Sequence, residues 1–116
     1  MKEILLEIKK SKFYGFLYEI SNQQQVSEIL QQLKKQHKKA THICYAYKIY
    51  DGAESVKFSD DGEPSGTAGR PILGVIEKKG KTNVMVVVVR YFGGIKLGAG
   101  GLVRAYTKTA SEVFSV

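Results

Sequence analysis

Residues 83–106, NVMVVVVRYFGGIKLGAGGLVRAY, form the segment around which the rest of the chain is organised. Six consecutive apolar residues, 84–89, include four valines in a row, and such a run is typical of a strand that is buried on both faces. Five glycines follow within nine residues, and apolar residues then recur at the spacing of one helix face. The stretch therefore predicts a strand, a glycine-rich loop and a helix in succession.

The glycine-rich loop is a candidate phosphate-binding site, because backbone N–H groups at a helix N-terminus favour an anion. Lys96 lies inside the loop, and Arg90 and Arg104 flank it. Neither the P-loop pattern nor the dinucleotide-binding pattern is matched, so the glycines could instead serve only tight turns and close helix packing. The predicted nucleic-acid or phosphate-binding residues are Arg70, Arg90, Gly93, Gly94, Lys96, Gly98, Gly100, Gly101, Arg104 and Lys108.

Length and composition indicate one globular domain, residues 1–116, with 43% hydrophobic and 25% charged residues. The net charge of +7 favours acidic partners, with nucleic acid or a ribonucleoprotein first among them, although a protein that is merely soluble and basic would also show it. Three early lysines are untypical of a signal peptide, and the single Cys44 cannot form an internal disulfide. We therefore expect a cytoplasmic protein that does not associate with membranes.

The periodicity of the whole chain predicts the element order β-β-α-β-β-α-β-α. A helix is expected to begin at Ser21, with Gln24 completing a capping box, and to end near His37. A second helix is expected to begin at Thr67 as N-cap and to stop at Gly80. The predicted strands are residues 4–8, 12–20, 41–50, 56–59 and 84–89, the first two joined by a turn around residues 9–11.

A second loop, residues 60–71 (DDGEPSGTAGRP), places three carboxylates ahead of that helix. They could hold Mg²⁺ together with substrate phosphates, cap backbone N–H groups of their own loop, or pair with an arginine. We favour a structural polar network over a metal site, made of Asp60, Asp61, Glu63, Ser65, Thr67 and His42. We also predict that the two loops meet, with one of the carboxylates within salt-bridge reach of Arg70, Arg90 or Arg104.

His42 and Cys44 lie two residues apart on a predicted strand and so share a face. Such a pair could form a dyad with a reactive thiolate. A small packed cysteine beside a structural histidine is the favoured interpretation. We predict that Cys44 is buried and unreactive, and we assign no catalytic residue.

Two blocks of sequence, residues 59–73 (SDDGEPSGTAGRPIL) and 86–106, resemble the signature blocks of the Impact/YigZ family. Shorter matches lie at residues 11–15 and 40–47, so the resemblance covers nearly the whole chain. It implies the family's N-terminal domain: an α+β fold, a two-layer α/β sandwich with a four- to five-stranded mixed sheet and helices on one face. The fold is like the second domain of ribosomal protein S five, with an unusual left-handed β-α-β crossover. Many bacterial relatives carry a C-terminal ferredoxin-like domain that these residues do not include.

The resemblance also implies a role linked to translation, because eukaryotic relatives restrain the amino-acid-starvation kinase by binding its ribosome-associated activator. We therefore predict a non-enzymatic binding module that regulates translation without a cofactor, with RNA, the ribosome, a translation factor or a regulatory protein as partner. Several aromatic residues could stack on bases, although most are expected to fill the core. The alternative is a nucleotide- or phosphate-binding enzyme of unknown reaction that uses both loops. The sequence leaves the oligomeric state open.

Overall fold

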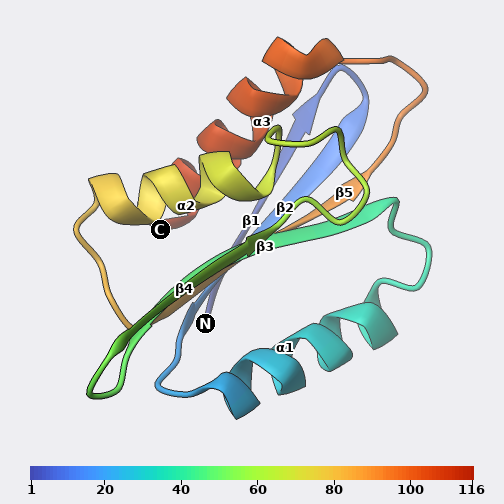
Figure 1. Cartoon of the computed structure of the whole chain (residues 1–116). Coiled ribbons are helices and arrows are strands. Elements are labelled where there is room, and N and C mark those ends of the chain that lie inside the picture. Colours follow the sequence, from blue (N-terminus) through green and yellow to red (C-terminus); the bar gives the residue numbers. More distant parts are fainter.

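The computed structural model of the protein describes all 116 residues. The elements occur in the predicted order (Figure 1). None of the three helices combines the length and the apolar character needed to cross a lipid bilayer. The elements are β1 (Lys2–Ile8), β2 (Ser11–Glu19), α1 (Gln23–Gln36), β3 (His42–Tyr50), β4 (Glu54–Ser59), α2 (Gly69–Lys78), β5 (Val84–Tyr91) and α3 (Gly98–Val113).

The five strands form one sheet in the order β1-β2-β5-β3-β4, with β5 at its centre. Successive residues of β5 alternate between two hydrophobic clusters, one on each face of the sheet. This confirms that the valine-rich run is buried on both faces. All four strand pairings are antiparallel, so the predicted mixed sheet is wrong. The reason is that β5 inserts between β2 and β3 and runs opposite to both.

Helices cover both faces of the sheet, which makes three layers instead of two (Figure 1). Helices α2 and α3 pack on one face, where Phe13, Ile72 and Tyr106 are buried. Helix α1 covers the other face, where Leu33 and Tyr47 are buried. The α+β class is confirmed, but the prediction that the helices share one face is wrong. A central strand with apolar side chains on both sides needs cover on both sides.

Two crossover connections, β2–α1–β3 and β4–α2–β5, determine the topology. Each passes over one strand and joins two strands that run parallel to each other. The two connections move in opposite directions along the sheet, between strands of opposite orientation, and on opposite faces. Each of these three differences reverses the hand of a crossover, and three reversals together leave the two connections with opposite hands. One of the two crossovers is therefore left-handed. The resemblance implied this departure from the usual right-handed rule.

The turn between β1 and β2 contains two residues, Lys9 and Lys10, because Ile8 pairs directly with Ser11. Both lysines have positive φ angles, 48° and 66°. Two positive φ angles define a type I′ turn, which prefers Asn-Gly to two lysines. Gly93 lies against this turn so closely that an added Cβ would overlap the Lys10 carbonyl. The hairpin turn and the glycine-rich loop are therefore packed together.

Helix α1 begins one residue later than predicted. Asn22 is the N-cap and Gln25 completes the capping box, with the Asn22 side chain accepting from the Gln25 N–H. Ser21 instead directs its backbone N–H to Oε1 of Gln25 at 2.6 Å. The capping chemistry was predicted correctly, and its register was shifted because Ser and Asn are both good N-caps. His37 is the C-cap, as expected, and its ring contacts the Tyr91 hydroxyl at 2.6 Å.

Candidate functional site

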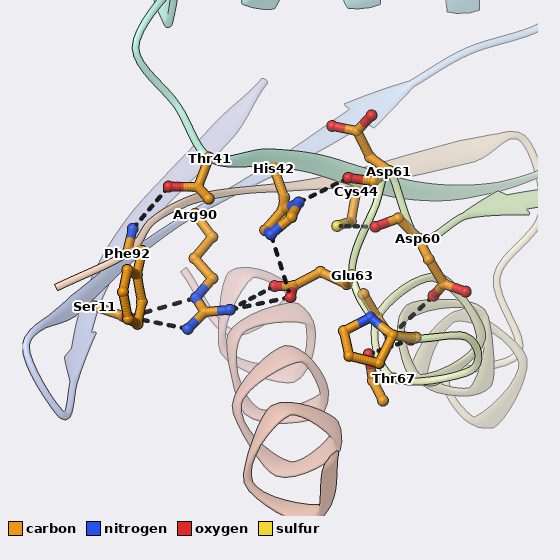
Figure 2. A network of polar contacts seen from close by, with 12 residues as sticks. Ser11, Thr41, His42, Cys44, Asp60, Asp61, Glu63, Thr67, Arg90 and Phe92 are labelled. Carbon is orange, nitrogen blue, oxygen red and sulfur yellow. Dashed lines mark hydrogen bonds and ion pairs between the residues drawn. The ribbon is translucent and has the colours of Figure 1, made fainter. Parts of the chain in front are cut away.

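Glu63 is the centre of a buried polar network beneath the two loops (Figure 2). Its side chain is only 3% exposed. Its two oxygens accept hydrogen bonds from Nη1 of Arg90 at 3.1 and 2.8 Å, and the Tyr106 hydroxyl donates to Oε2 at 2.5 Å. Nε2 of His42 lies 3.4 Å from Oε1. Glu63, in the loop of residues 60–71 (the acidic loop), thus connects β3, β5 and α3. The predicted ion pair between one of the three carboxylates and an arginine is confirmed.

Arg90, at the end of β5, is held from several sides. Its Nε and Nη2 atoms donate to the Ser11 hydroxyl at 3.4 and 3.3 Å. The same hydroxyl oxygen accepts from the Gly93 N–H at 3.3 Å. The guanidinium also lies over the rings of Phe13 and Phe92, 5.6 and 5.5 Å from their centroids. Buried cations need such compensation, and this arrangement fixes the start of the glycine-rich loop.

Asp60 caps α2 from a distance in the sequence. Its Oδ1 accepts from the N–H groups of Ala68 and Gly69 at 3.1 and 2.8 Å, and its Oδ2 accepts from Gly66 at 2.9 Å. Burial raises the pKa of Asp60, but these three hydrogen bonds outweigh it and hold the pKa below its usual range. The prediction that Thr67 is the N-cap is wrong, because its hydroxyl donates to a carbonyl inside the loop.

Of the remaining members of the predicted loop network, Asp61 and His42 make contacts within the protein and Ser65 does not. Oδ2 of Asp61 accepts from the Ile43 N–H at 2.6 Å, which fastens the loop to β3. Nδ1 of His42 lies 2.7 Å from the Asp61 carbonyl oxygen, so both nitrogens of this ring face the loop. Ser65 is exposed and makes no side-chain hydrogen bond. The three carboxylates are thus directed at separate partners and do not converge on one point.

Cys44 lies beneath the network and is completely buried. Its sulfur is 3.1 Å from the Asp60 carbonyl oxygen and 3.5 Å from the Tyr106 hydroxyl. Burial raises the pKa of Cys44 to about 12, and the hydrogen bond to Tyr106 lowers it only in part. The thiol therefore stays protonated at neutral pH, and the predicted burial is confirmed. His42 turns to Glu63 instead of the sulfur, so there is no Cys–His dyad.

The predicted basic residues fall into three groups. Arg90 belongs to the buried network, and Arg70 lies over the ring of Phe58 on the edge strand β4, 5.1 Å from its centroid. Lys96, Arg104 and Lys108 are exposed and make no ion pair. The idea that Arg104 pairs with the acidic loop is therefore wrong. The five predicted glycines lie in the loop and first turn of α3, and no side chain caps that helix.

Three further lysines, from the β1–β2 hairpin, extend the exposed basic group. Lys9 lines a shallow hollow together with Arg104 and Lys108, and Lys10 and Lys12 line a neighbouring one. The sequence pattern gave these three lysines no such role, because they precede Lys96 by more than eighty residues. We define the basic surface as Lys9, Lys10, Lys12, Lys96, Arg104 and Lys108, all of them exposed.

A cleft of about 420 Å³ separates the two loops. Glu63 and Pro64 contribute to it from the acidic loop, and Phe92, Lys96 and Leu97 from the glycine-rich loop. The two loops therefore form the walls of one hollow, with the buried ion pair at its base.

Sequence reasoning missed three polar partners in this region. Ser11 was placed in a predicted turn and within a stretch of resemblance, although its hydroxyl contacts Arg90. Tyr106 is one of the residues that recur at the spacing of the apolar helix face, and its ring is buried there, but its hydroxyl donates to Glu63. Thr41 was placed in a strand, and its Oγ1 accepts from the Phe92 N–H at 2.9 Å. Their residue types alone carried no signal of these contacts.

The protein is thus a small α+β domain in which a buried ion pair lies between the acidic loop and the glycine-rich loop. Residues 9–114 match the Impact N-terminal domain, and the chain belongs to this family. It is 53% identical over 105 residues to the IMPACT family member YvyE of Bacillus subtilis, a match that covers 90% of this chain and 48% of that protein. The chain thus spans about half the length of the curated relatives it matches.

Two solved structures share the fold. One, described as a hypothetical protein, superposes with a TM-score of 0.93 at 37% identity, and the match covers 98% of this chain and 56% of that one. The other, the two-domain translational regulator Yih1, gives a TM-score of 0.58 at 28% identity, and the match covers 98% of this chain and 44% of that one. Both are longer than the present chain, as YvyE is.

Proposed function

We propose that this domain is a non-enzymatic binding module linked to the regulation of translation, and that it contacts RNA, free or within the ribosome, through the basic surface. The similarity to Yih1, a protein described as a translational regulator, supports the link to translation. The observation that carries the RNA contact is that six exposed cations gather around the glycine-rich loop without a carboxylate partner.

The positive charge of the basic surface is not neutralised by the carboxylates of the acidic loop. The acidic loop lies next to it, yet its carboxylates accept hydrogen bonds from backbone N–H groups, from Arg90 and from Tyr106. The six cations of the basic surface therefore remain without an ion-pair partner within the protein. A cluster of lysine and arginine side chains without carboxylate partners attracts the phosphate backbone of a nucleic acid with little dependence on sequence.

The same contacts weigh against the alternative of a phosphate-processing enzyme. Such a site would need the carboxylates of the acidic loop to face the bound phosphates, together with Lys96. Asp60 instead caps α2, and Glu63 neutralises a buried arginine. These groups support the fold, which leaves the cations of the glycine-rich loop as the groups available to a ligand.

The test compares Lys96→Ala and Arg104→Ala with the wild type. RNA affinity is measured by fluorescence anisotropy, and ribosome association by co-sedimentation, over a range of salt concentrations. Removing one cation that binds a phosphate should lower the slope of log K against log salt by about 0.7 to 0.9. Lys35→Ala is the matched control, because it removes one exposed lysine from the last turn of α1 that is not part of the basic surface. The control should leave the slope unchanged.

Two outcomes would refute the proposal. One is a wild-type protein that associates with neither RNA nor ribosomes in a salt-sensitive way. The other is an unchanged slope in both folded variants, which would show that binding uses another surface.

A further inference from the structure

Phe92 is an aromatic residue held in an exposed position at the start of the glycine-rich loop. Its side chain is 47% exposed. Its backbone N–H donates to Thr41, and the fixed guanidinium of Arg90 lies 5.5 Å from its ring centroid (Figure 2). Arg90 itself is bound by Glu63 and Ser11. The ring is therefore positioned by the buried network while much of it remains open to solvent.

This ring lies between two hollows. On one side is the cleft between the loops, whose walls are mostly apolar and which carries Lys96. On the other side is a groove of about 330 Å³ lined by Lys10, Lys12, Tyr14, Tyr91 and Phe92. Phe92 is the residue common to both. An exposed ring thus has lysines on either side of it and further aromatic rings next to it.

We propose that the basic surface binds single-stranded nucleic acid, with one unpaired base stacked on Phe92 and the flanking phosphates contacting Lys10 or Lys12 on one side and Lys96 on the other. An aromatic ring within a basic groove is the arrangement that binds single strands, since every base has a face that can stack. A duplex keeps its bases inside the helical stack and cannot offer one to this ring. The inference rests on the proposed function, because it names the form of nucleic acid that the same surface recognises.

The probes are a labelled oligouridine of about 12 nucleotides, close to the length that one small domain covers, and an RNA duplex of the same length. We expect the single strand to bind more tightly than the duplex. Phe92→Ala and Phe92→Leu should each weaken single-strand binding by about 5- to 150-fold, the usual effect of losing one stacked base. Phe92→Tyr should keep nearly wild-type affinity. None of the three should change duplex binding, which depends on phosphate contacts.

Ile95→Ala is the matched control, because Ile95 is an exposed apolar residue of the same loop and lines neither hollow. It should bind the single strand as the wild type does. The position of Phe92 at the surface makes the Leu and Tyr variants well tolerated, and thermal melting of each variant checks that it is folded.

The outcomes separate this inference from the proposed function. Wild-type single-strand binding by folded Phe92→Leu, or equal affinity for duplex and single strand, overturns the stacking inference. If Lys96→Ala still loses affinity in that case, the proposed function stands. If neither RNA binds while an acidic peptide with an apolar side chain does, and Phe92→Ala abolishes that binding, the ligand is a protein segment and both proposals are wrong.

Discussion

The acidic loop and the glycine-rich loop look alike in sequence, but the polar side chains of the first bond within the protein and those around the second are exposed. Both are rich in glycine and both lead into a helix. In the acidic loop, Asp60 caps α2, and Gly69 packs so tightly that an added Cβ would lie 2.8 Å from the Ser59 backbone. In the glycine-rich loop no side chain caps α3, and a Cβ at Gly100 would meet only the far end of the Arg104 side chain, at 3.4 Å.

The more highly charged of the two loops is thus the structural one. Its carboxylates accept hydrogen bonds from other groups of the protein, whereas the cations around the glycine-rich loop remain exposed at the surface. Substitutions in the acidic loop should therefore change the free energy of unfolding, and substitutions around the glycine-rich loop should change binding.

The largest effect is expected for Glu63→Ala. Removing this carboxylate leaves the Arg90 guanidinium buried without its counter-charge, and the free energy of unfolding should fall by about 3 to 5 kcal/mol. Urea denaturation measures the change. Glu77→Ala, an exposed carboxylate on α2, is the control and should alter stability by less than about 0.5 kcal/mol. A loss for Glu63→Ala no larger than that of the control would mean that the ion pair does not hold the loops together.

A smaller effect is expected for Asp60→Asn, which replaces one accepting oxygen of the α2 cap by a donor. Loss of an N-terminal cap costs about 0.5 to 2 kcal/mol, measured at pH 7. Because the folded-state pKa of Asp60 is lowered, its carboxylate contributes stability above the unfolded value, and that contribution is lost as the pH falls through the folded value. The difference between wild type and variant should therefore shrink below about pH 4.

Denaturation series at several pH values test this pattern, with Asp51→Asn, an exposed aspartate, as the control. A stability difference that stays constant or grows on acidification would contradict the assigned role of Asp60.

The smallest change in stability is expected at the hairpin turn. The double variant Lys9→Asn, Lys10→Gly supplies the residues that a type I′ turn prefers and should raise the free energy of unfolding by about 1 kcal/mol. The same variant should bind RNA less tightly, and the salt slope should fall by about 0.7 for each of the two lysines that binds a phosphate. Lys34→Gln, Lys35→Gln on α1 removes the same charge and is the control for binding. A stabilised hairpin variant with wild-type affinity would remove Lys9 and Lys10 from the binding surface.

The local features of the fold could be predicted from the sequence. The run 84–89 predicted a strand buried on both faces, the glycine-rich loop predicted the start of α3, and the apolar spacing of residues 26–33 predicted α1. The sequence also indicated that the two charged loops meet. The strand and helix predictions depend on residues that are neighbours along the chain, whose periodicity and turn chemistry are visible without any three-dimensional information. The meeting of the loops was predicted from their charges.

The pairing of groups that are distant in the sequence could not be predicted and depends on the three-dimensional arrangement of the chain. In the folded chain β5 lies between β2 and β3, and α1 lies on the face opposite to α2 and α3. Glu63, and neither of the two neighbouring aspartates, is the partner of Arg90. Folding also brings the hairpin lysines beside the glycine-rich loop. Such pairings arise when distant segments close over a common core, because burial then makes an unpaired charge costly and leaves only partners of suitable position and geometry.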